Sequence, residues 1–314
     1  QSQFRETPFS SRVLINCFTE FLAVCGIVGN ILNIIILSDH GFHDTTNILL
    51  TSLASDDLIC CLTEVIIRLP YIITAYFQEI RFFLFCRQYL VILNYLSFSQ
   101  SQLLAAVIAV ERLAAVWFPF LVSRVFTPRR MMSLIILLHV ITFFFHSPGF
   151  ITYLAIQKTF KKNNVTTYHF VFKGLKDADI QAINWYLVFF VNIIYSTLPL
   201  LTILVSSILI MIKMFIITKE MKHLSASAVK SKKLKIIKAT KMLLVICLFS
   251  FSVCIVTFIL DIVPLLFELD NYFRVVCLDI SHIFYMLEMV LNFIIYVSMS
   301  SKFVQTYRKL FCTR

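Results

Sequence analysis

The stretch 86–120 constrains the fold of this chain more than any other, because it is an apolar segment with a charged pair near its end. Its middle is apolar enough to form a helix that crosses a membrane. Glu111 and Arg112 stand near its end, and Pro119 and Phe120 follow. Ionised residues at the end of a buried apolar helix are costly unless they are neutralised or have a function. The stretch therefore predicts a membrane helix that carries a charge pair at one end.

The two adjacent charges predict a conformational switch. The Glu111 carboxylate can hold the Arg112 guanidinium until another partner takes it, and a charge pair that exchanges partners can change the state of a protein. The alternative is an Arg112 side chain that extends to the lipid headgroups as an ordinary helix end. The length of the helix and the Pro-Phe pair that follows favour the switch.

The composition indicates a helical protein that crosses the bilayer several times. The chain has 314 residues, of which 59% are hydrophobic and only 14% are charged, whereas a soluble domain carries about 25% charged residues. The apolar excess must face something other than water, and a chain in lipid satisfies its backbone polar groups within helices. The spacing of Ser, His and Asp suggests no nucleophile with its base, so we do not expect an enzyme.

The basic residues are concentrated in three segments. The net charge is +11, and the segments 112–130, 213–241 and 302–314 hold four, nine and four of the 28 Lys and Arg residues. Lys and Arg accumulate on the cytoplasmic side of membrane proteins, so we assign these segments to the cytoplasm, where they face anionic lipid and an intracellular partner. Nucleic-acid binding is not expected, because the basic runs are short and lie between spans.

Seven apolar segments predict an all-α fold, a seven-transmembrane helix bundle. The helices are expected at about 13–37, 47–75, 86–120, 131–154, 183–218, 239–265 and 274–298. Residues 1–12 would be an extracellular N-terminus, and 13–298 the transmembrane domain. The segment 155–182 is expected to be a polar loop, and 219–238 a Lys-rich loop. Residues 299–314 would form a cytoplasmic tail whose apolar and basic residues suit a short amphipathic helix on the membrane surface.

Two residues outside the spans are candidate modification sites. Asn164 begins the glycosylation sequon Asn-Val-Thr in a loop that we place outside. Cys312 lies beside the predicted surface helix and is a palmitoylation candidate, although a lone cysteine there is unmodified about as often. A transporter or channel is an alternative function, but the sequence has no internal repeat, which argues against a repeat-built transporter.

Polar residues within the spans follow the order of landmarks in a known receptor family. They are Asn30, Leu53-Ala54-x-x-Asp57, Glu111-Arg112, Pro199 and Asn292-x-x-x-Tyr296. In this order the chain resembles the rhodopsin-like (class A) G-protein-coupled receptors over about 13–312. GFHDTTN before the second span and Ser300-Ser301-Lys302-Phe303 after the last are similar to an invertebrate branch. That branch includes FMRFamide-type neuropeptide receptors and molluscan receptors labelled chemosensory.

The resemblance implies a multi-pass plasma-membrane receptor with its N-terminus outside. Its partners would be an extracellular ligand and a heterotrimeric G protein. The residues of the activation switch would be Glu111, Arg112, Pro199, Asn292 and Tyr296. The residues that meet the G protein would be Arg112, Pro119 and Phe120.

The chain also departs from the family pattern. Phe293 stands where the family has a Pro in the last span, and Val253 or Cys254 stands where it has a Trp in the sixth. The sixth span has no Pro in its middle. These departures leave a non-signalling decoy receptor as an alternative function. The loop 155–182 contains no Cys, so the disulfide that usually ties it to the third span cannot form.

A buried sodium site is also implied by the resemblance. Asp57, Ser101 and Asn292 match members of that site, and Glu288 lies one helical turn before Asn292. Carboxylate, hydroxyl and amide oxygens suit a small hard cation. Two neighbouring carboxylates cannot both stay ionised without a cation, so one binds a proton or the pair holds sodium. The alternative is that Glu288 points elsewhere; no cofactor besides this sodium ion is expected.

Polar and aromatic residues near the outer ends of the spans predict a ligand cavity. Glu64 and Arg68 are four apart and can pair. Ionisable groups at membrane depth are functional candidates by default, and the alternative is a purely structural ion pair. The predicted lining is Glu64, Arg68, Asn94, Tyr95, Phe98, Asp261, Asp279, His282 and Tyr285. Its mixed charges suggest a peptide or a small polar ligand.

Two receptor subclasses are excluded by their chemistry. An opsin needs a Lys in the last span to form a Schiff base, and 274–298 has none. An aminergic receptor needs a carboxylate in the third span, and Asn94 occupies the matching place.

One disulfide bridge is a further candidate. Cys17 and Cys277 lie near the outer ends of the first and last spans. These helices are neighbours in the family's fold, so the two Cα atoms could come within the roughly 6 Å that a bridge allows. The alternative is that both are free cysteines that act as small apolar residues.

Overall fold

The computed structural model describes residues 9–73, 81–153, 156–162, 165–171, 179, 182–183, 185–221, 227–267, 271–299 and 301–312. Its long helices are α1 (Phe9–Asp39), α2 (Thr45–Ile73), α3 (Arg81–Trp117), α5 (Pro128–Tyr153), α7 (Leu198–Met221), α8 (Ser227–Leu266) and α9 (Asn271–Met299). Two π-helical segments, η1 (Tyr186–Val191) and η2 (Ile193–Thr197), lead into α7. The short elements are α4 (Pro119–Val125), α10 (Ser301–Phe311) and the strands β1 (Ile156–Lys162) and β2 (Val165–Val171).

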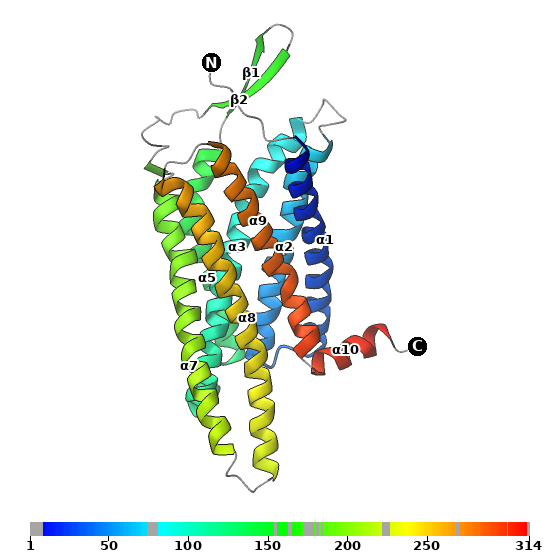
Figure 1. Ribbon diagram of the computed structural model, residues 1–314, viewed down its shortest axis with the longest axis vertical. Helices are drawn as coiled ribbons and strands as arrows, with labels where there is room; N and C mark the ends of the chain where they lie inside the picture. Colours follow the sequence, from blue (N-terminus) through cyan, green and yellow to red (C-terminus); the bar gives the residue numbers. More distant parts are fainter. Residues whose placement is uncertain are drawn as a thin grey trace.

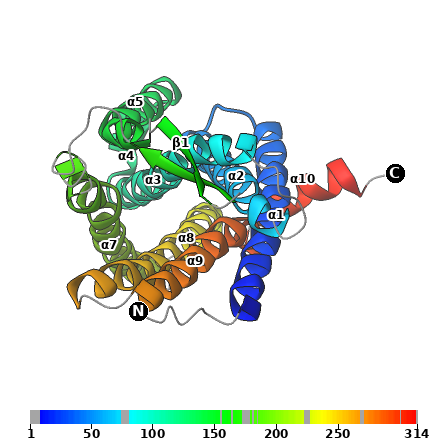
Figure 2. The ribbon, with the colours of Figure 1, turned by 90° about the horizontal axis from the view of Figure 1, so that it is seen from above.

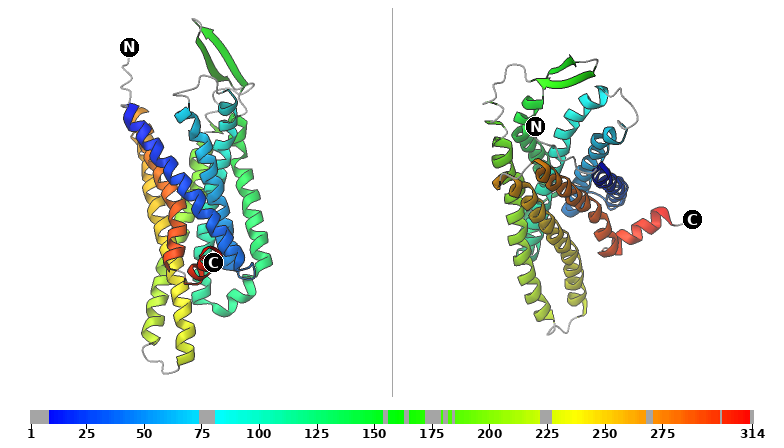
Figure 3. Two further views of the ribbon diagram at one scale, coloured as in Figure 1. Left: turned by 90° about the vertical axis from the view of Figure 1, so that its right-hand side faces the viewer. Right: turned by 45° about the horizontal axis from the view of Figure 1, so that its top comes forward.

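The seven long helices run side by side in one bundle, as predicted (Figure 1). The β1–β2 hairpin lies at one end of the bundle and α10 at the other, and we call these the hairpin end and the tail end (Figure 3). Figure 2 looks onto the hairpin end, where the hairpin lies over the helices. α3 is the central helix, because it packs against α2, α5, α7 and α8.

Membrane-spanning character is clear for most of the bundle. Five helices in the described part are long and apolar enough to cross a membrane, over Leu14–Asp39, Tyr89–Trp117, Pro128–Gly149, Phe189–Glu220 and Phe273–Ser298. α8 contributes a shorter apolar stretch, Leu244–Leu260. α2 carries two acids side by side and an acid–base pair, which lower its hydropathy. Large apolar side chains such as Phe144 and Phe215 point out of the bundle, as lipid-facing residues do.

Two segments expected to be loops contain regular structure. The segment 155–182 holds the antiparallel strands β1 and β2, in register from Ile156 opposite Val171 to Lys162 opposite Val165. The β-branched and aromatic residues of β2 favour a strand. The Lys-rich loop is helical from Ser227 onward, because Ala, Lys, Leu and Ile continue α8 and neither Gly nor Pro interrupts it.

Prolines mark helix starts at the tail end and a change of helix type near α7. Pro119 and Pro128 are the first residues of α4 and α5, where a missing N–H costs nothing. Pro199 lies in the first turn of α7, directly after η2. Because Pro cannot donate a backbone hydrogen bond, regular α-helical bonding is interrupted around it.

The tail helix α10 is held against the end of the bundle. Phe303 is buried, with its ring centroid 5.8 Å from that of Tyr296. Thr306 hydrogen-bonds His40 at 2.9 Å, and Lys309 Nζ lies 3.7 Å from an Asp39 carboxylate oxygen. The amphipathic helix predicted after the last span is therefore present, with its apolar face on α9 and its polar face near the end of α1.

Candidate functional site

The charge pair on α3 lies at the tail end and is closed. Arg112 Nε lies 2.5 Å from Glu111 Oε2, and Arg112 Nη2 lies 2.9 Å from Glu111 Oε1. Arg112 Nη2 also donates to the Thr46 hydroxyl of α2, and the Thr45 hydroxyl donates to Glu111 at 3.3 Å. Glu111 is buried. The predicted switch pair is thus held by the start of α2 as well as by itself.

The other residues predicted for the switch lie above this pair. Tyr296 is buried, and its hydroxyl has no hydrogen-bond partner within the described residues. Asn292 Nδ2 donates to Asp57 Oδ2 at 2.8 Å. Pro199 lies on α7 and is not among the residues that contact Arg112 through a hydrogen bond or ion pair. Among the residues predicted to meet a G protein, Phe120 is 93% exposed on α4.

The predicted sodium site comes together around Asp57. This carboxylate is fully buried and accepts hydrogen bonds from Ser101 at 2.6 Å and from Asn292 at 2.8 Å. The Asn292 Oδ1 atom is buried and has no partner in the described part of the chain. Carboxylate, hydroxyl and free amide oxygens are suitable donors for a small hard cation. The residues present therefore fit the ion.

Glu288 lies close to this site but is bonded elsewhere. It is buried, and its Oε2 atom accepts a hydrogen bond from Gln102 Nε2 at 3.0 Å. The Gln102 Oε1 atom in turn accepts from Cys254 Sγ at 2.8 Å. The fourth predicted sodium ligand thus connects α9 to α3 and α8. Within the described residues, no three His, Cys, Asp or Glu side chains gather as a metal centre.

Asp56, for which the sequence suggested no role, pairs with α5. Its Oδ1 atom lies 3.2 Å from His139 Nε2. His139 Nδ1 lies 3.1 Å from the Gln100 amide nitrogen, and Thr142 donates to the Gln100 amide oxygen at 2.8 Å. His139 and His146 are seven residues apart and thus share the α5 face that meets α3. This spacing in the sequence was the signal that could have identified the contact.

A cavity of about 430 Å³ opens in the hairpin-end half of the bundle. Side chains of α2, α3, α5, α8, α9 and the two π-helical segments line it. Asn94, Tyr95, Phe98, His282 and Tyr285 were predicted and do line it. The lining residues that the prediction missed include Ser99, Gln102, His146, Asn192, Tyr195, Ser196, Cys254 and Thr257.

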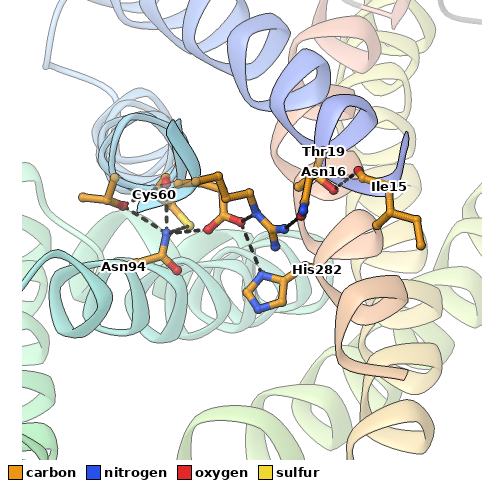
Figure 4. A network of polar contacts seen from close by, with 9 residues as sticks. Ile15, Asn16, Thr19, Cys60, Asn94 and His282 are labelled. Atoms are coloured by element: carbon orange, nitrogen blue, oxygen red, sulfur yellow. Dashed lines mark hydrogen bonds and ion pairs between the residues drawn. The ribbon is translucent and has the colours of Figure 1, made fainter. Parts of the chain in front are cut away.

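The predicted charged pair lies behind this cavity rather than in its wall. Glu64 and Arg68 are 2% and 8% exposed, and Arg68 Nε bonds Glu64 Oε1 directly. Figure 4 shows the surrounding network, in which Arg68 also donates to Asn16 of α1 at 2.6 Å and His282 Nδ1 lies 3.6 Å from Glu64. Asn94 donates to the Cys60 carbonyl at 3.0 Å (Figure 4). The prediction that Glu64 and Arg68 line the cavity is wrong, because each neutralises the other within the helix packing.

The two remaining acids of the predicted lining do not join the cavity. Asp279 is half-buried and is not a lining residue. The Asp261 side chain lies outside the described residues. Among the described residues that line the cavity, none is Asp, Glu, Lys or Arg.

The predicted disulfide is absent, because Cys17 and Cys277 are both free. α1 and α9 do pack together, but Cys17 is exposed whereas Thr19 is fully buried. Two residues correspond to about 200° around a helix, so Cys17 points away from the bundle. Cys312 is free and exposed. Asn164 lies outside the described residues.

Comparison with known proteins agrees with this architecture. Residues 29–296 match the family described as 7 transmembrane receptor (rhodopsin family). The chain is also similar to "Putative G-protein coupled receptor F59B2.13" of Caenorhabditis elegans, with 28% identity over 173 residues. That match covers 52% of this chain and 38% of the worm protein, so it spans well under half of its relative. With a seven-helix bundle and a match over most of its length, this multi-pass membrane protein belongs to the rhodopsin family of seven-transmembrane receptors.

Proposed function

We propose that this protein is a plasma-membrane receptor that binds an extracellular ligand in the hairpin-end cavity and activates a heterotrimeric G protein at its tail end. The observation that carries the proposal is the closed contact of Arg112 with Glu111 and Thr46. It lies on α3, the helix that also lines the cavity. The basic segments lie at the tail end, which supports a cytoplasmic tail end and an N-terminus outside.

The mechanism is a shift between two arrangements of the bundle. In one, Arg112 is held by Glu111 and Thr46. In the other, Arg112 leaves these partners, the tail end opens, and Pro119, Phe120, the basic start of α8 and α10 meet the G protein. A ligand shifts the equilibrium only as far as its affinity differs between the two arrangements.

The cavity suits a small polar ligand better than a peptide. Ligand pockets of about 300–1,000 Å³ take molecules of drug size, and this cavity has about 430 Å³. A peptide would need to leave most of its residues above the bundle. The invertebrate branch with FMRFamide-type and chemosensory receptors remains part of the proposal, and it is supported by GFHDTTN before Ile48 and by 300–303.

A sodium ion at Asp57 is a second part of the proposal. Asp57, Ser101 and Asn292 would hold it, with Glu288 as a neighbouring acid. An ion there would neutralise a carboxylate that is otherwise buried without a countercharge. Glycosylation of Asn164 and palmitoylation of Cys312 are further proposals that follow from the same orientation.

Substitution of the switch pair tests the function. Glu111→Gln weakens the hold on Arg112 and should raise ligand-free signalling, whereas Arg112→Ala should abolish G-protein activation at unchanged surface expression. The measurement is G-protein dissociation in cells, with a sensor for each G-protein subtype and surface labelling as the control. Normal signalling by Arg112→Ala would mean that the pair is an ordinary helix end.

A decoy receptor is the second candidate function. α8 is one unbroken helix over Ser227–Leu266, without Pro or Trp in its middle, and Phe293 replaces a Pro in α9. Both features remove helix hinges that other members of the family have. A wild-type protein that binds ligand but dissociates no G protein would favour the decoy. The rhodopsin-family match argues against a transporter or channel.

A further inference from the structure

The α3 wall of the hairpin-end cavity has polar groups that are already bonded. Asn94 Nδ2 donates to the Cys60 carbonyl and to Thr63 Oγ1, both at 3.0 Å. The Gln102 amide donates to Glu288 at 3.0 Å and accepts from Cys254 at 2.8 Å. A ligand that bonded either amide nitrogen or the Gln102 oxygen would have to displace contacts between helices, whereas Asn94 Oδ1 has no hydrogen-bond partner within the described residues.

The histidine in the α5 wall is committed in the same way. His146 Nδ1 lies 2.9 Å from the Thr142 carbonyl oxygen, which can only accept, so this nitrogen carries the proton. His146 Nε2 lies 3.0 Å from the Ser99 hydroxyl, within hydrogen-bonding distance. Both ring nitrogens thus have partners within the protein, so the ring offers a ligand no unused nitrogen.

The opposite wall, formed by η1, η2 and the residue between them, has polar groups that are free. Asn192 and Ser196 line the cavity, and within the described residues their side chains form no hydrogen bond. Tyr195 is 3% exposed, and its hydroxyl has no hydrogen-bond partner in the same part of the chain. Thr142, the polar side chain beside it, gives its own proton to Gln100, so the Tyr195 oxygen stays open as a hydrogen-bond acceptor. π-helical segments are rare in proteins overall, but they are frequent at functional sites. Their presence in this wall agrees with a ligand contact here.

The rest of the cavity is apolar and aromatic. The ring centroids of Phe98 and Tyr285 lie 4.2 Å apart, and these rings face the interior of the bundle with Met286 beside them. Leu187 and Val191 line the η1 side. Such walls bind an apolar body through buried area and ring contacts.

No Asp, Glu, Lys or Arg is part of the described lining, and its two histidines are His146 and His282, of which His282 faces Glu64 at 3.6 Å. The Glu64–Arg68 pair lies behind the wall and is neutral as a pair. An ionised ligand group would lose its hydration without gaining a countercharge, and burial of an unpaired charge is strongly unfavourable. An uncharged ligand avoids this cost.

We infer that the ligand is a small uncharged molecule with an apolar, partly aromatic body and one hydrogen-bonding group, such as a hydroxyl or a carboxamide, that meets Asn192, Tyr195 and Ser196. The inference names the ligand class for the proposed function. It rests on that function in one respect, namely that this cavity is the ligand site.

The test is a binding measurement on the purified full chain in lipid nanodiscs by surface plasmon resonance. The probes are a panel of matched alcohols, amines and carboxylic acids on indole, phenyl and naphthyl bodies, of which tryptophol, tryptamine and indole-3-acetic acid are one trio. We expect the tightest alcohol to bind at least tenfold more tightly than its amine and its acid. Ser196→Trp, which fills the cavity, should abolish this binding.

Variants of the free polar wall test the placement of the hydrogen-bonding group. At least one of Asn192→Leu, Tyr195→Phe and Ser196→Ala should weaken binding of the tightest alcohol about three- to tenfold, the effect of one lost hydrogen bond. Ile193→Leu is the matched control, because Ile193 lies on η2 and is exposed on the lipid side. Asn192→Asp places a carboxylate in the wall and should shift the preference toward the amine.

Three outcomes overturn the inference: tighter binding of an amine or an acid by the wild type, no binding by any alcohol of the panel, or equal binding by all three wall variants. If amine binding disappears in Asp261→Asn, a carboxylate at that position supplies the countercharge and the inference is wrong. The function is tested separately, with the tightest compound in the G-protein dissociation assay. Alcohol binding without G-protein dissociation contradicts the signalling proposal and supports the inference. G-protein dissociation triggered by an amine supports the signalling proposal and contradicts the inference.

Discussion

Thr46 completes the hold on Arg112 at the tail end of the bundle. The guanidinium bonds both oxygens of Glu111 and also donates to the Thr46 hydroxyl. The first half of α8, residues 227–247, contains no Asp or Glu in the sequence. A carboxylate on that part of α8 therefore cannot restrain Arg112. The closed arrangement depends instead on a hydroxyl of α2, so α2 must separate from α3 locally before Arg112 is released.

Thr46→Val should therefore raise ligand-free signalling. The substitution removes one hydrogen bond to a charged group and keeps the shape of the side chain, so the closed arrangement loses about 1–2 kcal/mol. That shift should raise basal G-protein dissociation severalfold at equal surface expression.

Thr51→Val is the matched control for this variant. Thr51 lies on the same helix, and its buried hydroxyl has no hydrogen-bond partner within the described residues. Basal signalling of Thr51→Val should match the wild type. If Thr46→Val also matches the wild type, α2 does not restrain the switch.

Residue spacing predicted some side-chain contacts, but it did not predict where in the bundle these side chains lie. Glu64 and Arg68 pair as their spacing of four predicts. Spacing does not tell how far a helix is rotated toward its neighbours, so the pair was wrongly assigned to the cavity wall. The sequence suggests no role for Asp56, because its partner, His139, lies 83 residues away on another helix.

At the scale of helices, α1 approaches its neighbours closely where it has glycines. A Cβ atom on Gly26 would lie 2.5 Å from Cys61 Sγ of α2, and one on Gly29 would lie 3.1 Å from Phe293 Cβ of α9. Small residues allow membrane helices to pack backbone to backbone. The bulky Phe293, which stands where the family has a Pro, is thus accommodated opposite a glycine.

Gly26→Ala should destabilise the bundle, and Cys61→Ala should rescue it. The added methyl overlaps the Cys61 sulfur, and strain of this kind typically costs 1–3 kcal/mol. In the double variant the methyl would meet Val290 Cγ2 at 3.5 Å and the Cβ of residue 61 at 3.6 Å, both ordinary contacts. The measurement is the apparent Tm of the purified protein in detergent. A double variant no more stable than Gly26→Ala would show that the sulfur is not the obstacle.

Helix positions followed from apolar runs, but helix ends and the hairpin did not. The apolar part of α8 marks where it crosses the membrane, whereas its start at Ser227 depends on good helix formers in a Lys-rich segment. β1 and β2 were missed because the polar residues of 155–182 outweighed the strand preference of Val165–Val171. Hydrophobicity identifies segments that contact lipid, but it carries no information on structure outside the membrane.

Buried polar residues connect the two ends of the bundle. The cavity is lined by Gln102, which bonds Glu288 of α9. One turn further along α9, Asn292 bonds Asp57 of α2. The start of α2 then holds Arg112 through Thr46. Under the proposed function, these contacts would form the route by which a ligand at the hairpin end biases the tail end.

Sodium should stabilise the bundle through the Asp57 site. The apparent Tm in sodium chloride should exceed that in choline chloride at equal ionic strength, because choline is too large for the site. Asp57→Asn should remove the difference, since the ion loses its carboxylate. Asp39→Asn, which changes an exposed carboxylate near α10, should keep it. A wild-type Tm that is the same in both salts would leave Asp57 without an ion.

The length of α8 has a consequence for how motion reaches the tail end of the bundle. At 40 residues it is about 60 Å long, roughly twice the hydrocarbon thickness of a bilayer, and with α7 it projects beyond the other helices (Figure 1). A helix without a central kink behaves as a rigid lever. Tilted by about 10° around its midpoint, it would carry its basic tip sideways by roughly 5 Å. A stiff arm of this kind transmits a displacement beside the cavity to the far end without any bend along the way.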